Sequence, residues 1–361
     1  MVQSTPPKDP MSTPLRKLQT RLSHERAMSI AHFMDFALTD PDAGYYTTTQ
    51  PLGTRGDFTT SPEISPLFGE IVAARLIHAW QELGSPSPFI LMELGPGRGT
   101  LMADVLRVGR RVTGFSEAAK VLLVEKSPVL RTAQKEALEP FTTPAWFETI
   151  EDALLDTNLP LFLLANEYFD ALPIRQFEMT PEDWRERGVA LDDEGRLTWC
   201  HLPPTNIPML PHADHGTVKE FSPATHAHLH LIFGHLARLG GCAFICDYGY
   251  VQGWGDTLQG VKNHAYCDVL QHAGSCDISA HVDFGAMELI ARTYPTLTHA
   301  LTTQGAFLKE NHIDVRAQQL LPHAKDKEAL LAGRNRLVDE DAMGKLFKVF
   351  FVQSPLTEPT P

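Results

Sequence analysis

The stretch Phe89-Ile90-Leu91-Met92-Glu93-Leu94-Gly95-Pro96-Gly97-Arg98-Gly99-Thr100 decides the fold of this chain of 361 residues. Its first six residues are mostly apolar, which predicts a buried strand. Three glycines at alternate positions then predict a tight turn that lets the backbone approach a ligand closely. Apolar residues at positions 101, 105 and 106 predict that a helix follows. This order of strand, glycine turn and helix is typical of a Rossmann-like fold, in which ligands bind at the carboxyl ends of the strands.

The spacing of the glycines indicates the kind of ligand. The dinucleotide pattern GxGxxG is not met, because each glycine is two positions from the next. A GxGxG turn with an acid at the end of the preceding strand and another after the following strand favours S-adenosyl-L-methionine. The alternative is a tight turn with no ligand. The residues predicted to bind the cofactor are Glu93, Gly95, Gly97, Gly99, Glu125 and Asn166.

Glu125 ends the second predicted strand, which covers residues 120–125. A carboxylate at this place can accept hydrogen bonds from both ribose hydroxyls of an adenosine. The alternative is a surface acid that pairs with Lys126.

Strands and helices alternate beyond this point, which predicts a mostly parallel, doubly wound α/β sheet. Residues 174–202 alternate around an expected hairpin turn at 192–196, and residues 203–216 are rich in proline and predict a loop. Residues 249–284 are polar and show no period. Further strands are expected at 161–166, 242–247, 298–302 and 346–352, and helices at 15–38, 66–83, 128–138, 222–239, 285–294, 312–320 and 324–336.

These patterns predict the following organisation of the chain. Residues 1–14 form a disordered tail, and residues 15–88 form an N-terminal helical and lid segment. Residues 89–352 form the Rossmann-like domain, with insertions at 174–216 and 249–284, and residues 353–361 form a second tail.

The candidate catalytic residues follow the strand at 161–166. Glu167 and Asp170 could hold a guanidinium group in a bidentate manner and help to remove a proton, with Asn166 beside them. The alternative is that Asn166 and Asp170 only cap a helix. A second polar segment, residues 56–63, could close over the site as a lid and bring Asp57 to it; here the alternative is a loop followed by a helix cap.

Composition excludes several classes of function. The net charge of −13 disfavours nucleic acid as a partner. No apolar run reaches the length of roughly 18 residues that predicts a membrane span. Five cysteines without a CxxC pair favour a reducing compartment. We expect the bacterial cytoplasm, with the mitochondrial matrix as the alternative. No metal site is expected, because only two of the histidines at 226, 228 and 230 share a helix face.

Several motifs in order resemble the MidA family of S-adenosylmethionine-dependent methyltransferases, over about residues 28–352. They are Gly44-Tyr45-Tyr46, Gly56-Asp57-Phe58, residues 60–65, Phe68-Gly69-Glu70, residues 93–100, 125–128 and 166–173, Asp247-Tyr248-Gly249-Tyr250, residues 256–259, 281–284 and 343–348.

The resemblance implies a seven-stranded methyltransferase core with an added N-terminal helical segment and inserted hairpin or cap regions. It also implies a protein partner, because the family includes a mitochondrial enzyme that methylates an arginine of the 49 kDa-type subunit of respiratory complex I. Two other functions stay open at this point. They are methylation of another nitrogen in a small molecule or protein, and a donor-binding assembly chaperone without turnover. The sequence does not fix the oligomeric state.

Overall fold

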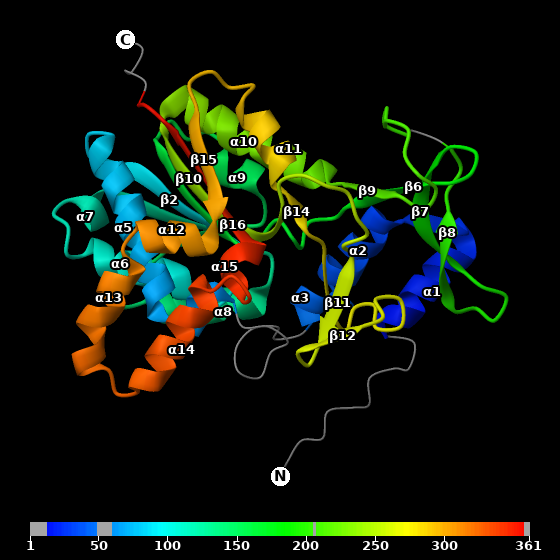
Figure 1. Ribbon diagram of the computed structural model, residues 1–361, viewed down its shortest axis with the longest axis horizontal. Helices are drawn as coiled ribbons and strands as arrows, with labels where there is room; N and C mark the ends of the chain where they lie inside the picture. The colour runs from blue at the N-terminus through cyan, green and yellow to red at the C-terminus, as the bar shows by residue number, and fades with distance from the viewer. Residues whose placement is uncertain (1–12, 49–59, 205–206, 357–361) are drawn as a thin grey trace.

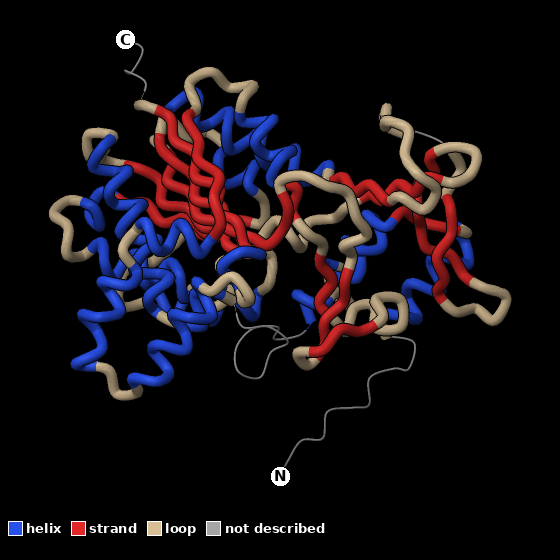
Figure 2. The backbone as a smooth tube through the Cα atoms, in the orientation of Figure 1, coloured by secondary structure: helices blue, strands red, loops and turns tan. Residues whose placement is uncertain are grey.

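The computed structural model describes residues 13–48, 60–204 and 207–356. An eight-stranded sheet forms its centre, with helices on both faces (Figures 1 and 2). Seven strands lie in the order β15-β16-β10-β5-β2-β3-β4, and β14 pairs with β10 off this path. Their bounds are β2 Phe89–Leu94, β3 Ala119–Val124, β4 Ala145–Phe147, β5 Leu161–Asn166, β10 Gly241–Tyr250, β14 Val282–Asp283, β15 Thr298–Thr303 and β16 Phe347–Ser354.

The pairing is parallel from β4 through to β10, and only β16 runs antiparallel to its neighbours β10 and β15. This confirms the prediction of a mostly parallel α/β sheet. All six residues of β2 and all six of β5 are buried, as expected for central strands covered on both faces. Their carboxyl ends lie side by side, because the two strands are hydrogen-bonded in parallel register.

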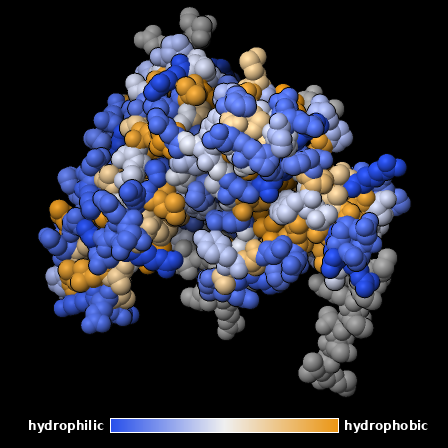
Figure 3. Space-filling view, turned by 45° about the vertical axis from the view of Figure 1, so that its right-hand side comes forward, coloured by the Kyte–Doolittle hydropathy of each residue, from blue (hydrophilic) through white to orange (hydrophobic). Residues whose placement is uncertain are grey.

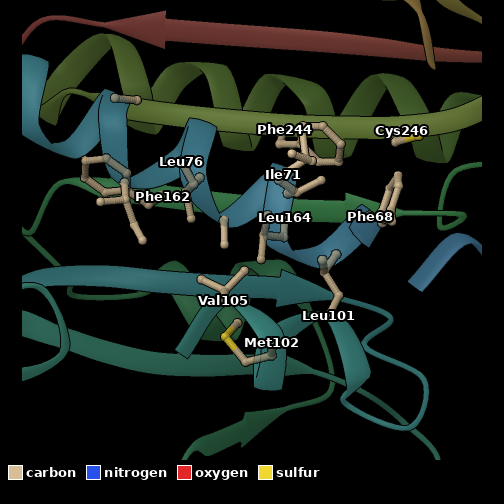
Figure 4. Packing of buried hydrophobic residues seen from close by; sticks show 14 of the residues in the cluster. Phe68, Ile71, Leu76, Leu101, Met102, Val105, Phe162, Leu164, Phe244 and Cys246 are labelled. Atoms are coloured by element: carbon tan, nitrogen blue, oxygen red, sulfur yellow. The ribbon is translucent and has the colours of Figure 1, made fainter. Parts of the chain in front are cut away.

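Helices cover each face of the sheet with a separate apolar cluster. Figure 4 shows the first cluster, where Phe68 and Ile71 of α5 and Leu101 of α6 pack against the sheet. The second cluster is centred on α10 and α11, with Phe233 and Phe284 fully buried. The helices of the core are α5 Pro66–Glu82, α6 Thr100–Gly109, α7 Phe115–Ala118, α8 Pro128–Leu138, α9 Ile150–Leu154, α10 Pro223–Leu239, α11 Phe284–Ala291, α12 Gln304–Glu310, α13 Ile313–Leu320, α14 Lys327–Val338 and α15 Met343–Leu346, and η2 at Leu321–His323 is a 3₁₀ turn.

The prediction of one continuous helix over residues 15–38 is wrong. The structure has α1 (Pro14–Glu25), a short strand β1 (Ala27–Ser29) and α2 (Ile30–Thr39). Arg26 ends α1 with a left-handed φ of 67°, and the Ser29 side chain caps α2 by accepting the His32 N–H. Met28 pairs with Val189 of the inserted sheet. Tertiary pairing, which leaves no local pattern, therefore interrupts the helical period.

The expected hairpin insertion is present. β6 (Arg175–Met179), β7 (Trp184–Leu191), β8 (Leu197–His201) and β9 (Val218–Phe221) form an antiparallel sheet with β1. The turn falls where it was predicted, because Gly195 has a φ of 75° and donates its N–H to the Asp192 carbonyl.

The structure shows more order in residues 249–284 than the sequence predicts. The short strands β11 (Gln259–Lys262), β12 (Ala265–Cys267) and β13 (Asp277–Ser279) form a separate three-stranded sheet. Ile278 packs in one cluster with residues of α1 and α2, and Figure 1 shows this sheet beside α3 (Tyr45–Thr48). Strands of three or four residues are too short to reveal alternation.

The surface of the molecule is largely hydrophilic on the face that Figure 3 shows, with separate apolar patches. Across the described ranges, no helix combines the length and apolar character that crossing a membrane requires.

Candidate active site

A cavity of about 660 Å³ lies at the carboxyl ends of β2, β3 and β5. Of the residues predicted to form the site, it is lined by Glu93, Gly95, Gly97, Glu125, Asn166, Glu167 and Asp170. Segments outside the central sheet close its other side. They contribute Leu38 and Thr39 of α2, Tyr46 and Thr47 of α3, Pro62 and Glu63 of α4 (Ser61–Ile64), and Asp277 of β13.

The glycine loop enters the cavity in a conformation that favours glycine. Gly95, Gly97 and Gly99 have φ values of 56°, 53° and 83°, in the left-handed region that side chains with a Cβ disfavour. A Cβ on Gly95 would lie 3.0 Å from Cδ2 of Tyr168. Gly99 is the N-cap of α6 and does not line the cavity; a Cβ there would face Gln134 instead. Gly99 therefore contributes to the conformation of the turn without lining the cavity.

Glu93 lies beneath this loop and is 3% exposed. One carboxylate oxygen accepts a hydrogen bond from the backbone of Met102, and Oε2 has no partner within the described ranges. Burial raises the pKa of Glu93 to about 8. A cationic ligand in the cavity would favour its ionised form.

Hydrogen bonds hold the Glu125 carboxylate in place. The Ser127 N–H donates to Oε1 at 2.8 Å, and Gln134 Nε2 donates to Oε2 at 3.1 Å. Burial raises the pKa of Glu125 in spite of these bonds. Gln134 also donates to the Gly97 carbonyl at 2.8 Å, so one amide joins Glu125 to the glycine loop. The sequence prediction missed Gln134, whose place on α8 gives no local sign of this role.

Glu167 stands at the end of β5 with a left-handed φ of 51°. Its Oε1 accepts the Ser61 N–H and the Asn166 side-chain amide, each at 3.0 Å. Burial raises the pKa of Glu167 to about 7, and the negative charges of Asp170 and Asp277 add to the rise. This carboxylate is therefore fixed in space and titrates near neutral pH.

Asp170 lies beside it and is 9% exposed. Tyr248 hydrogen-bonds to its carboxylate, Oδ1 has no partner within the described ranges, and burial raises its pKa to about 6. The helix-cap alternative for Asn166 and Asp170 is wrong, because no helix begins between 166 and 173. Instead, Asp247 accepts the backbone N–H groups of Phe169 and Asp170.

Residues 71–301 match a family of S-adenosyl-L-methionine-dependent methyltransferases. The Drosophila melanogaster "Protein arginine methyltransferase NDUFAF7 homolog, mitochondrial" is 34% identical over 92% of this chain and 83% of its own length. The human "Protein arginine methyltransferase NDUFAF7, mitochondrial" is 32% identical over 96% of this chain and 84% of its own. This chain belongs to that methyltransferase family.

A solved structure agrees with the family. A protein from Burkholderia thailandensis, crystallised with S-adenosylhomocysteine, superposes with a TM-score of 0.81 at 26% identity, over 98% of this chain and 96% of its own. The methyltransferase described here therefore has S-adenosylmethionine as its methyl donor, and the resemblance found in the sequence motifs is confirmed.

The lining of the cavity fits this donor. Oε2 of Glu93, Oδ1 of Asn166 and Oδ1 of Asp170 are buried acceptor atoms without partners among the described residues. S-adenosylmethionine carries an ammonium group, a sulfonium group and two ribose hydroxyls, which are cations and donors that such oxygens can receive. Glu125 and the glycine loop lie at the end of the cavity formed by β2 and β3.

Some residues that line the cavity were not predicted as site residues. Tyr46 donates a hydrogen bond from Oη to Oδ1 of Asp277 at 2.7 Å, and both residues line the cavity with Tyr248. Tyr46 and Tyr248 lie in motifs that carry the family resemblance, but their spacing alone indicates no role. No motif or pattern in the sequence indicated a role for Asp277.

The lid prediction is only partly covered by the structure. Asp57 lies outside the described residues, so its role stays a prediction. Glu63, from the same predicted segment, lines the cavity, and Arg98 of the glycine loop lies 3.8 Å from it. Among the residues with described positions, no group of three His, Cys, Asp or Glu side chains is arranged to hold a metal ion.

Proposed function

We propose that this methyltransferase methylates a guanidine nitrogen of an arginine side chain in a protein. The observation that carries the proposal is the pair of carboxylates, Glu167 and Asp170, on the wall of the donor cavity. Planar guanidinium groups pair with carboxylates through two parallel hydrogen bonds. Oδ1 of Asp170, which has no hydrogen-bond partner among the described residues, offers an acceptor for such a bond.

The same carboxylates suit the proton balance of the reaction. S-adenosylmethionine, when bound, supplies an electrophilic methyl group on a sulfonium. Methylation of a protonated guanidinium nitrogen releases one proton, because the product is again a monocation. Glu167, with a pKa of about 7, can accept this proton near neutral pH. Asp170 then keeps a negative charge beside the cationic product.

The names of the relatives support a protein arginine as the acceptor, since the curated relatives quoted above are named protein arginine methyltransferases. By the family resemblance, we extend the proposal to the 49 kDa-type subunit of respiratory complex I. Those relatives are also named mitochondrial, which favours the second of the two compartments expected from the sequence.

The test uses the purified full chain with S-adenosyl-L-[methyl-³H]methionine and a purified 49 kDa-type complex I subunit. Acid hydrolysis of the labelled subunit and amino-acid chromatography should place the radioactivity in methylarginine. Glu167→Gln should incorporate about 10²–10⁴-fold less label while it still binds S-adenosylhomocysteine. Label in methyllysine or methylhistidine would overturn the arginine assignment, and binding of both donor and subunit without label would favour the chaperone function.

A further inference from the structure

Four residues from distant parts of the chain, one of them Glu167, form a closed ring of hydrogen bonds. Ser61 donates its backbone N–H to Oε1 of Glu167 at 3.0 Å. The Ser61 hydroxyl donates to Oε1 of Gln304 at 3.2 Å, and the Cys246 thiol donates to the same oxygen at 3.3 Å. The ring closes because the Glu167 N–H donates to the Cys246 carbonyl at 2.8 Å.

Gln304 joins Ser61 to Cys246 in this ring. It is 0% exposed, stands at the start of α12 and does not line the cavity. Its Nε2 donates to the Leu337 carbonyl at 2.8 Å, which fixes the orientation of the amide and turns Oε1 toward Ser61 and Cys246. These hydrogen bonds together hold the buried Gln304 amide in one orientation.

We propose that Gln304 is a positioning residue that acts through Ser61: it holds the Ser61 backbone N–H against the Glu167 carboxylate. Ser61 is also 0% exposed, so water does not replace Gln304 as the partner of its hydroxyl. The inference deepens the proposed function, because it rests on Glu167 as the group that takes up the proton.

The chemistry of the ring gives the proposal a measurable consequence. A hydrogen bond to the ionised carboxylate favours that form, and the Ser61 N–H lowers the pKa of Glu167 against the effect of burial. The other charges near Glu167 all act in the opposite direction: Asp170 and Asp277 raise its pKa. Asp247 and the Cys246 thiol also lie close enough for Glu167 to raise their own pKa values. The hydrogen bond from Ser61 therefore lowers the pKa of Glu167, whereas the neighbouring negative charges raise it.

The test is a titration of the Glu167 carboxyl in the full-length protein by ¹³C NMR, with ¹³C-labelled glutamate and with Glu167→Gln to assign the signal. Ser61→Ala and Gln304→Met should each move the midpoint upward, by about one pH unit. The double variant should show no further shift, because both changes break the same link. Gln176→Met is the matched control. Gln176 is an equally buried glutamine of β6 that donates to Glu220 of β9 and to Asp256. Its loss should leave the midpoint unchanged.

The pH dependence of the methyl-transfer rate gives a second, independent measurement. The rate that Ser61→Ala loses at pH 7 should return when the pH is raised, which a purely structural defect would not allow. An unchanged midpoint in Ser61→Ala and in folded Gln304→Met would overturn the proposal, and so would shifts that add in the double variant. These results do not depend on the acceptor, because the carboxyl titration needs no substrate. If the wild type makes no methylarginine, it is the proposed function that fails.

Discussion

The Tyr168 ring lies against Gly95 so closely that a Cβ on the glycine would come within 3.0 Å of Cδ2. Gly95 also has a φ of 56°. Gly95→Ala therefore strains the backbone, by about 1–2 kcal/mol, and pushes the ring or the loop out of place. We expect the dissociation constant for S-adenosylhomocysteine to rise about tenfold or more, as measured by isothermal titration.

Gly195→Ala provides the control for this prediction. Gly195 has a similar φ of 75°, but among the described residues, apart from its own chain neighbours, no atom lies within 4 Å of a Cβ placed there. Gly195→Ala should lose about as much stability as Gly95→Ala but bind S-adenosylhomocysteine as the wild type does. Equal affinity in Gly95→Ala would show that the loop has room for a side chain.

The glycine loop could be predicted because all of its determinants are contiguous. The apolar run, the glycines and the following helix fall within one short stretch, and the predicted strand at 161–166 and helix at 128–138 agree with β5 and α8. Ser127 caps that helix, with Pro128 at its first position, which is a local signal in the sequence.

The rest of the site depends on contacts that no local pattern records. Tyr46 and Asp277 are separated by 231 positions, and Ser61 and Gln304 by 243. The sequence places chemistry at 166–170 because a parallel strand ends there. It gives no means of finding which residues from α3, β13 or α12 reach the same place, since those pairings arise only when the insertions pack on the core.

The rate of methyl transfer should depend on pH through Glu167. Its pKa lies near 7, and the group must be ionised to accept a proton. We expect kcat/KM to fall tenfold per pH unit below about pH 7 and to level off above it. Glu167→Gln should lower kcat by about 10²–10⁴-fold and abolish this limb. A pH profile with the same limb in Glu167→Gln would assign the titration to another group.

Glu93 should make the donor-free protein less stable at alkaline pH. Its pKa is raised from 4.5 in the unfolded chain to about 8 in the fold, so the folded state binds the extra proton between these values. The contribution of Glu93 to the free energy of unfolding is therefore fully present below about pH 4.5, and it is lost as the pH rises toward 8. The loss at pH 8 is about 2–5 kcal/mol.

Glu93→Gln removes this titration and tests the prediction. Its melting temperature should exceed that of the wild type at pH 8, and the two should converge near pH 5. Glu139→Gln is the control, because Glu139 is exposed on the surface and should show no such difference. A difference in melting temperature that is the same at both pH values would mean that Glu93 is already ionised in the fold.

Asp247 should organise the carboxylate wall without touching the donor. It is 0% exposed, and its Oδ2 accepts the N–H groups of Phe169 and Asp170 at 3.0 and 3.2 Å, while Oδ1 accepts the Tyr248 N–H at 2.9 Å. Asp247→Ala leaves these buried donors unpaired, at about 1–3 kcal/mol each. Asp247→Asn keeps an oxygen that Phe169 and Asp170 can share.

We therefore expect Asp247→Ala to lose stability in urea denaturation and to lower kcat at least about tenfold, because Asp170 loses its anchor. Its affinity for S-adenosylhomocysteine should stay near that of the wild type, since Glu93, Glu125 and the glycine loop are untouched. Asp247→Asn should be intermediate in both stability and kcat. If folded Asp247→Ala turned over at the wild-type rate, the position of Asp170 would not matter for catalysis, and Glu167 alone would have to hold the guanidinium.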